Sequence, residues 1–364
     1  MRRDPWDETS PDMRGTPRDD PAERRDGRGG GHDGDGDGHG RAARPVVLDA
    51  MGGDHGPAET VRGAVRARRE HGVPVILTGR SDVLRRELAA LGAEGEVGVA
   101  HATEVVSMAE RGAGALAKTG SSLAVGFGLL REGTAASLVS AGSTGAVVAT
   151  AVRRLGLAPP VLRPGLAVAL PSVRGGATVL IDAGATVDPS PEMIAQFALL
   201  GVSYAQLVLG VADPSVGLLS IGAEPGKGNR LTRRAEELLR WTPLRFHGTV
   251  EGHDVLAGTV DVIVTDGFTG NVVLKNVEGT VRATLALLAR HGVAGPERLR
   301  EVGRLYDPDT HGGAVLLGLT GTVVVAHGSS RASTIARACV VARDLAEGGV
   351  VARVRDRLTI KPAR

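Results

Sequence analysis

Lysine is scarce in this sequence and lies mainly in glycine-rich segments, where it could bind an anion. Only four of the 43 lysine and arginine residues are lysines, and Lys118, Lys227 and Lys275 lie in ALAKTGSS, EPGKGN and GNVVLK. An ammonium group turns three N–H donors toward a phosphate in a geometry that a planar guanidinium does not reproduce. We therefore predict that Lys227 and Lys275 bind an anionic ligand, with Lys118 as a further candidate. The alternative for each is an exposed lysine without a ligand.

An amide and two imidazoles extend this set of reactive side chains. Asn271 lies four residues before Lys275 in a helix predicted over 271–290, so that both face the same side of its first turns. His55 and His327 both lie in glycine-rich loops, where an imidazole can act as an acid or a hydrogen-bond donor near neutral pH. The alternative for both histidines is to hydrogen-bond the loop itself.

Glycine makes up 53 of the 364 residues, roughly twice its usual share. Five glycine-rich loops directly follow predicted strands: LDAMGGDHG (48–56), SAGSTGA (140–146), IDAGATVD (181–188), IGAEPGKGN (221–229) and TDGFTGN (265–271). Ligands of open α/β sheets bind at the carboxyl ends of strands, where helix N-termini attract anions. We expect the five loops to meet at one edge of the sheet and to bind a phosphorylated or polyanionic ligand. The candidate binding residues are Gly52, Gly53, Asp54, Ser122, Gly142, Ser143, Thr144, Gly145, Lys227, Asn229, Gly270 and Ser329.

Several other sites are excluded or disfavoured. Neither GxGxxG after the first strand nor GxxxxGK[ST] occurs, so no nucleotide loop is evident and no cofactor is predicted. A net charge of +2 is too small for a nucleic-acid binder that neutralises phosphates. Four aspartates at the ends of predicted strands could ligate a metal ion: Asp49, Asp54, Asp182 and Asp266. We expect no metal, because aspartates at strand ends usually cap helices or brace loops. The single cysteine, Cys339, lies on the apolar stripe of a helix and is predicted to be a core residue.

Short apolar runs alternate with amphipathic segments and must position these side chains. The predicted strands are 46–49, 75–78, 97–100, 136–139, 165–169, 178–182, 216–221, 260–264 and 322–326. The predicted helices are 58–71, 82–91, 121–132, 144–155, 191–201, 229–240, 271–290 and 330–346. Apolar strands alternating with helices predict an α/β fold with a doubly wound, mainly parallel sheet.

The chain is expected to contain a single folded domain. Residues 1–44 hold no Val, Ile, Leu, Phe or Tyr and are predicted to form a disordered tail rich in Arg, Asp and Gly. The domain is placed at 45–350, followed by a C-terminal extension over 351–364. One cysteine and the lack of an apolar leader at the start predict a cytoplasmic protein.

Taken in order, the motifs resemble the phosphate acyltransferase family of bacterial glycerolipid synthesis, the PlsX family. The motifs are LDAMGGDHGP (48–57), SAGSTGA (140–146), DAGATVD (182–188), GKGN (226–229), VEGHD (250–254), DGFTGNVVLK (266–275), GGAVLLG (312–318) and HGSS (327–330). The resemblance implies a fold similar to the isocitrate and isopropylmalate dehydrogenases. It also implies a reaction in which the fatty acyl group of an acyl carrier protein moves to inorganic phosphate and forms acyl phosphate. Two positions depart from the family pattern, because Ser143 and Thr186 stand where the family usually has asparagine.

For this chemistry, Asn271 and Lys275 are candidates to hold phosphate or the oxyanion, and His55 or His327 to protonate the departing thiolate. The implied partners are acyl carrier protein, phosphate, a second copy in a homodimer, and a membrane glycerol-3-phosphate acyltransferase, with peripheral contact at the inner face of the membrane left open. Candidate surfaces are the arginines of 58–71 and 229–240 for the carrier protein, and an apolar stripe in 271–290 for a dimer, the acyl chain or the membrane.

Three alternative functions remain open. They are a short-chain phosphotransacylase of the acetyl-CoA type, an NAD(P)-dependent decarboxylating dehydrogenase of the same fold, and a non-catalytic scaffold of lipid synthesis. The lack of a nucleotide motif argues against the dehydrogenase. Only eight aromatic residues are available to stack a nicotinamide or adenine ring, which points the same way.

Overall fold

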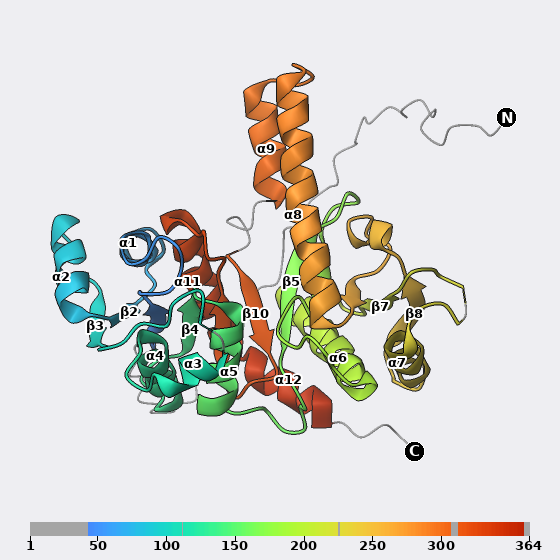
Figure 1. Cartoon of the computed structure of the whole chain (residues 1–364), viewed down its shortest axis with the longest axis horizontal. Coiled ribbons are helices and arrows are strands. Elements are labelled where there is room, and N and C mark those ends of the chain that lie inside the picture. Colours follow the sequence, from blue (N-terminus) through green and yellow to red (C-terminus); the bar gives the residue numbers. More distant parts are fainter. Residues whose placement is uncertain (1–42, 111, 225, 307–311, 360–364) are drawn as a thin grey trace, which may run out of the picture. The chain divides into compact units, whose positions relative to one another are not determined.

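An 11-stranded sheet is the framework of the described residues, which are 43–110, 112–224, 226–306 and 312–359 of this computed structural model (Figure 1). The strand order is β3-β2-β1-β4-β11-β10-β5-β6-β9-β7-β8. The strands are β1 Val46–Asp49, β2 Val75–Gly79, β3 Gly98–His101, β4 Ser137–Ser140, β5 Gly165–Pro171, β6 Ala177–Ile181, β7 Ser215–Leu219, β8 Arg245–Val250, β9 Val262–Val264, β10 Ala314–Leu317 and β11 Thr322–Val325. The tail predicted over 1–44 lies outside the described residues except for its last two positions.

The sheet consists of two parallel halves that run in opposite directions. Strands β3, β2, β1, β4 and β11 are parallel to one another, and so are β6, β9, β7 and β8. Between the halves, β10 and β5 pair antiparallel with their neighbours. The predicted α/β fold with a mainly parallel sheet is confirmed, but the central antiparallel pair was not predicted.

Helices cover both faces of the sheet. They are α1 Ala58–His71, α2 Ser81–Ala90, α3 Gly112–Ala117, α4 Ser122–Arg131, α5 Thr144–Arg154, α6 Pro191–Val208, α7 Arg230–Arg240, α8 Gly267–Arg290, α9 Pro296–Tyr306, α11 Ala332–Glu347 and α12 Val350–Thr359, with a short 3-10 helix, η1, at Gly252–Val255. Successive residues of one strand point to opposite faces, so Val46 and Leu48 pack in one core and Val47 in the other. Both faces of these strands are buried, which explains their continuous apolar sequences.

Most predicted elements are present within a few residues of their expected bounds. Strands β8 and β10 and helices α3, α9 and α12 were not predicted, because they are short, polar or glycine-rich in sequence. Helix α6 continues seven residues beyond its predicted end at 201. Helix α8 begins at Gly267, where Asp266 caps it, so the predicted start at Asn271 is wrong by one turn.

Helices α8 and α9 form a hairpin that extends away from the sheet (Figure 1, orange). Helix α8 buries only Gly267 and Gly270, and α9 has no buried residue. The first turns of α8 therefore belong to the body of the domain, whereas its later turns contact mainly α9. Among the described residues, no helix is long and apolar enough to cross a membrane.

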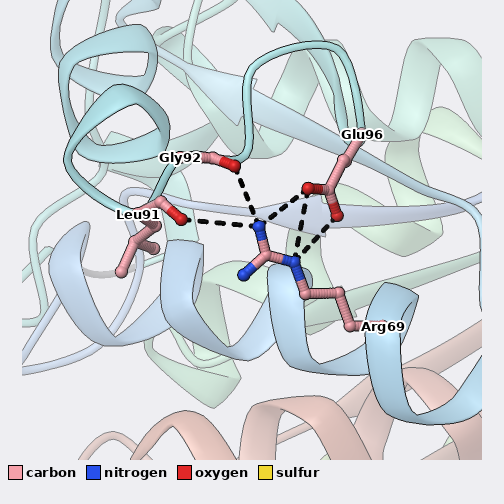
Figure 2. A network of polar contacts seen from close by, with 4 residues as sticks. All are labelled: Arg69, Leu91, Gly92 and Glu96. Carbon is pink, nitrogen blue, oxygen red and sulfur yellow. Dashed lines mark hydrogen bonds and ion pairs between the residues drawn. The ribbon is translucent and has the colours of Figure 1, made fainter.

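The arginines of α1 are paired with glutamates. Arg69 binds the Glu96 carboxylate at 2.7 Å and the carbonyl oxygen of Gly92 at 2.9 Å, which fastens α1 to the loop after α2 (Figure 2). This contact lowers the pKa of Glu96. Arg62 and Arg66 also pair with glutamates within α1. The positive face predicted for partner docking is thus largely balanced by negative charge.

Candidate functional site

A cavity of about 500 Å³ lies where the two halves of the sheet meet. The loops after β4, β6 and β11 line it together with Asp54 from the loop after β1, the first turns of α8, and strand β5. The predicted site residues that line it are Asp54, Gly142, Ser143, Thr144, Gly145, Asn271, Lys275 and His327. Loops that are remote in sequence are therefore brought to one cavity, as a functional site requires.

The strand directions correct the expectation that five loops share one edge. The carboxyl ends of β1, β4 and β11 point one way, and those of β6, β7 and β9 point the other way. The two groups still meet, because the register of β5 with β10 and β6 brings the ends of β11 and β6 to the same level, beside Ala167 and Val168. Helix α8 then starts just after β9 and lines the cavity together with β5. In this way the second half contributes Lys275 to a site next to β11.

Lys275 is the centre of a chain of polar contacts. Its Nζ lies 2.8 Å from His327 Nε2 and 2.9 Å from a carboxylate oxygen of Glu278. The other ring nitrogen, His327 Nδ1, lies 2.7 Å from Ser329 Oγ. The backbone N–H of Ser329 also donates to Nδ1 at 3.2 Å, so Lys275, His327 and Ser329 form one connected set of contacts. The Lys275 ammonium lines the cavity and can offer N–H donors to a ligand there.

The N-terminus of α5 forms a second wall of the cavity. Ser143 is the N-cap residue, but its side chain accepts no hydrogen bond from the first turn. Ser143, Thr144 and Gly145 all line the cavity. A helix start without a side-chain cap leaves backbone N–H groups available to an anion. An anion in this cavity would face both this helix end and Lys275.

Asp182 organises the loop after β6. Its Oδ1 accepts hydrogen bonds from the backbone N–H groups of Leu166, Gly184 and Ala185 at 2.9 to 3.0 Å, and its Oδ2 accepts one from Thr186 at 2.6 Å. Burial raises the pKa of this carboxyl, and the four donors oppose that rise. The expectation that Asp182 braces its loop is confirmed.

The first turn of α8 packs tightly on this loop. The backbone N–H of Gly267 donates to Thr186 at 2.9 Å, and a side chain at Gly270 would overlap the carbonyl group of Asp182. Gly270 therefore allows a close approach of two backbones. Its position places Asn271 beside Gly184 at the wall of the cavity.

Asp49 organises the loops after β1 and β4, as Asp182 organises the loop after β6. It is buried, and it accepts a hydrogen bond from Ser140 Oγ at 2.8 Å and another from the side chain of Ser122. Burial raises the pKa of this carboxyl against the effect of these hydrogen bonds. Ser140 Oγ in turn accepts from the Gly142 N–H at 3.1 Å, so Asp49 supports the glycine loop that lines the cavity.

Other predicted residues lie outside the cavity lining. Lys227 is exposed in the loop after β7, and Asn229 caps α7 by accepting from the Thr232 N–H at 2.8 Å. Ser122 is buried beside Asp49, and His55 is half-buried in the loop after β1. The remaining candidates contribute through packing or hydrogen bonds: Gly52 on Gly142, Gly53 on Gly328, Gly270 on Asp182 and Ser329 on His327.

Two further sequence candidates are accounted for by structural contacts. Lys118 binds Glu110 at 2.7 Å and the carbonyl oxygen of Val105 at 2.7 Å. Cys339 is buried, and burial raises the pKa of its thiol to about 12, which confirms its core position.

The apolar wall formed by β5 was not predicted from the sequence, whereas an apolar stripe in 271–290 was. The apolar walls of the cavity include Leu166, Val168 and Leu170 on β5 and Leu274 and Val277 on α8. In the sequence, the β5 residues cannot be distinguished from ordinary core positions. Glu278, which orients Lys275, could have been found from its i, i+3 spacing.

The site thus joins a cationic end to an apolar groove. Among the described residues, no group of three or more His, Cys, Asp or Glu side chains could hold a metal ion. A ligand that fits has an anionic or polarised head near Lys275 and an apolar tail along β5.

Comparison with known proteins gives consistent results. The family model described as "Fatty acid synthesis protein" matches residues 45–353. The chain is 53% identical over 329 residues to a phosphate acyltransferase from Thermobifida fusca, a match that covers 86% of this chain and 91% of that protein. It is 42% identical over 323 residues to the phosphate acyltransferase from Desulforamulus reducens, covering 86% and 97%.

Solved structures support the fold at low sequence identity. A phosphotransacetylase from Streptococcus pyogenes has a TM-score of 0.58 and 19% identity, with 84% of this chain and 95% of that chain covered. A 4-hydroxythreonine-4-phosphate dehydrogenase from Klebsiella pneumoniae has a TM-score of 0.52 and 14% identity, covering 84% and 100%. The predicted dehydrogenase-like fold is confirmed by the latter.

Proposed function

The chain belongs to the fatty acid synthesis protein family of phosphate acyltransferases, and from this premise we propose that it moves a fatty acyl group from acyl carrier protein to inorganic phosphate. The product is acyl phosphate, which serves phospholipid synthesis. Membership of the family supports transfer of an acyl group to phosphate. The carrier protein as donor is our proposal.

The observation that carries the proposal is the contact between Lys275 and His327 at the end of an apolar cavity. Phosphate needs fixed N–H donors, and these are available at Lys275 and at the N-terminus of α5. A fatty chain needs apolar walls, which β5 and α8 provide. Few other substrate pairs combine a small dianion with a long apolar chain.

The proposed reaction begins when a phosphate oxygen attacks the thioester carbonyl carbon. The carbonyl oxygen becomes an oxyanion, for which the Asn271 amide and the Lys275 ammonium in the cavity lining are candidate donors. The carbon–sulfur bond then breaks and the electron pair leaves on sulfur. The hydrogen of hydrogenphosphate ends on the thiol, so the reaction needs no external acid and no oxidant.

Lys275 is proposed to carry this proton. Its Nζ can donate to the departing thiolate and regain a proton from the bound hydrogenphosphate, while the contact with His327 Nε2 at 2.8 Å orients the ammonium. Glu278 keeps the ammonium in place. His55, outside the cavity lining, is assigned no role in this step.

The test is a direct assay of the product. The protein is incubated with palmitoyl-carrier protein and phosphate, and acyl phosphate is trapped with hydroxylamine as hydroxamate. Hydroxamate that forms only when phosphate is present is the expected result. Activity with palmitoyl-CoA but not with palmitoyl-carrier protein would show that the carrier protein is not the donor. Activity restricted to acetyl-CoA would indicate a short-chain phosphotransacylase.

We also propose that the enzyme works as a homodimer at the cytoplasmic face of the membrane. Leu287 and Val293 at the end of the α8–α9 hairpin are more than half exposed, which favours contact with a second copy or with lipid. Sedimentation velocity would test the dimer. Flotation with vesicles would test the membrane contact.

A further inference from the structure

A second cavity lies beyond the site, between α8 and α9. It has a volume of about 910 Å³ and is lined by apolar and small residues, including Val281, Leu285, Ala289, Leu299 and Gly303. Gly303 lies where the two helices face each other across the groove, because a methyl group at this position would contact Leu285 at 3.4 Å. The α8–α9 hairpin therefore holds a groove of the same character as the wall of the first cavity.

The two cavities are adjacent along α8. Glu278 and Tyr306 line both of them. On α8, Leu274 and Val277 face the first cavity and Val281 and Leu285 face the second. These four residues recur every three or four positions and form one apolar stripe of roughly 16 Å at 1.5 Å per residue. An extended apolar ligand can therefore pass from one cavity to the other without leaving the stripe.

We propose that the acyl chain of the substrate passes Tyr306 and continues into the groove between α8 and α9, which thereby sets the preferred chain length. This inference rests on the proposed function. The occupant follows from the shared lining residues and the common apolar stripe, because the groove leads away from the cation at which the acyl carbonyl reacts. A fatty chain is the part of that substrate that needs an apolar path.

The borders of the groove agree with this occupant. Arg282, Arg300 and Arg304 line it and are exposed, and the long stems of arginine can cover an apolar chain while the charged ends stay in water. The groove has apolar residues along both helices, as a chain without polar groups requires.

The test fills the groove without touching the reacting groups. Gly303→Leu places a side chain inside the groove, and leucine is favoured over glycine in a helix, so folding should be preserved. Gly279→Leu is the matched control, because Gly279 lies on α8 with open space around its added side chain and lines neither cavity. Rates are measured with octanoyl, lauroyl and palmitoyl thioesters, and binding with cis-parinaric acid.

The expected result is a loss that depends on chain length. Each methylene excluded from an apolar site weakens binding about fourfold, so Gly303→Leu should lower palmitoyl kcat/KM by about tenfold or more relative to octanoyl. Gly279→Leu should keep the profile of the unmodified protein. An unchanged profile in Gly303→Leu would overturn the inference, and an equal loss at every length with altered sedimentation would assign the groove to a contact between copies.

The binding measurement separates this inference from the proposed function. If the unmodified protein binds cis-parinaric acid and Gly303→Leu weakens that binding about tenfold, the groove holds an acyl chain whatever the reaction. If no acyl phosphate forms in the same preparation, the proposed function alone fails. If both glycine variants bind cis-parinaric acid equally well, the proposal that the groove binds an acyl chain is wrong.

Discussion

Lys275 owes its position to contacts with two side chains, one near in sequence and one remote. Glu278 lies one helical turn away, whereas His327 is 52 residues away and is itself held by Ser329. An ammonium fixed between a carboxylate and an imidazole is oriented before a substrate binds. Fixed donors stabilise developing negative charge better than mobile ones, because no reorganisation is needed during the reaction.

Removal of this ammonium should reduce the rate strongly. We expect Lys275→Ala to lower kcat by a factor of about 100 to 1,000, the usual effect of losing one such donor. Lys227→Ala is the matched control, since Lys227 is exposed outside the cavity lining and its loss should leave the rate within about twofold. The hydroxamate assay measures both. Equal losses in the two variants would assign phosphate binding to the loop after β7.

Asp49 should make stability depend on pH. Its pKa in the folded protein is raised above the ordinary 3.8, so the folded state binds a proton more strongly than the unfolded state. The resulting stabilisation is complete below pH 3.8 and is lost as pH rises through the raised pKa. The free energy of unfolding of the unmodified protein minus that of Asp49→Asn should therefore fall as pH rises.

Urea unfolding of both proteins at a series of pH values measures this difference. Ser140→Ala is a useful control, because it removes a donor to the carboxylate without removing the titrating group. A difference that is constant or rises with pH would contradict the prediction.

At the scale of elements, α8 connects the two halves of the site. Its first turn is anchored by Asp266 and by the loop that Asp182 braces, and its next turns carry Asn271 and Lys275 to the cavity. Its later turns border the groove against α9. One helix thus joins the anion-binding end to the apolar path.

Two glycines of α8 should respond in opposite ways to the same substitution. Gly270→Ala forces a methyl group against the backbone of Asp182 and should destabilise the protein by about 3 kcal/mol, while lowering activity through the shift of Asn271. Gly279→Ala has open space and should stabilise by about 0.5 to 1 kcal/mol, because alanine favours the helix. Urea unfolding measures the change in stability of each variant. Changes of the same sign in the two variants would contradict the packing described for α8.

At the scale of the whole molecule, the opposed halves create the cleft. Two parallel units alone would each present a separate edge of loops. The antiparallel strands β5 and β10 join them, and their outer surface becomes the apolar wall of the cavity. The cleft therefore exists only in the complete domain, and we expect neither half to carry activity when expressed alone.

Cys339 can report on the unfolding of this domain. It is the only cysteine, it is buried, and its pKa of about 12 keeps the thiol protonated near neutral pH. We expect a thiol reagent to label the folded protein far more slowly than the protein in concentrated urea. Rapid labelling without denaturant would show that α11 opens locally, contrary to its buried position.

Much of the secondary structure was accessible from sequence because it depends on local patterns. Runs such as VVLD before LDAMGGDHG mark a buried strand and its loop, and β1 and α1 were predicted to the residue. Strand β10 was missed because a run of only four apolar residues does not distinguish a strand from a buried helical segment. Helix α9 was missed because its apolar residues face α8, a contact that the sequence does not reveal.

The sequence by itself determined the family, the α/β class and the residue types of the anion site, because glycine loops and scarce lysines are visible without coordinates. Only the tertiary structure decided which of them act together. It brought Lys275 to His327 and left Lys227 outside the cavity lining, although both lysines stand in similar glycine-rich segments. The physical reason is that strand direction and the path of α8 are set by packing of the whole sheet, which no local pattern encodes.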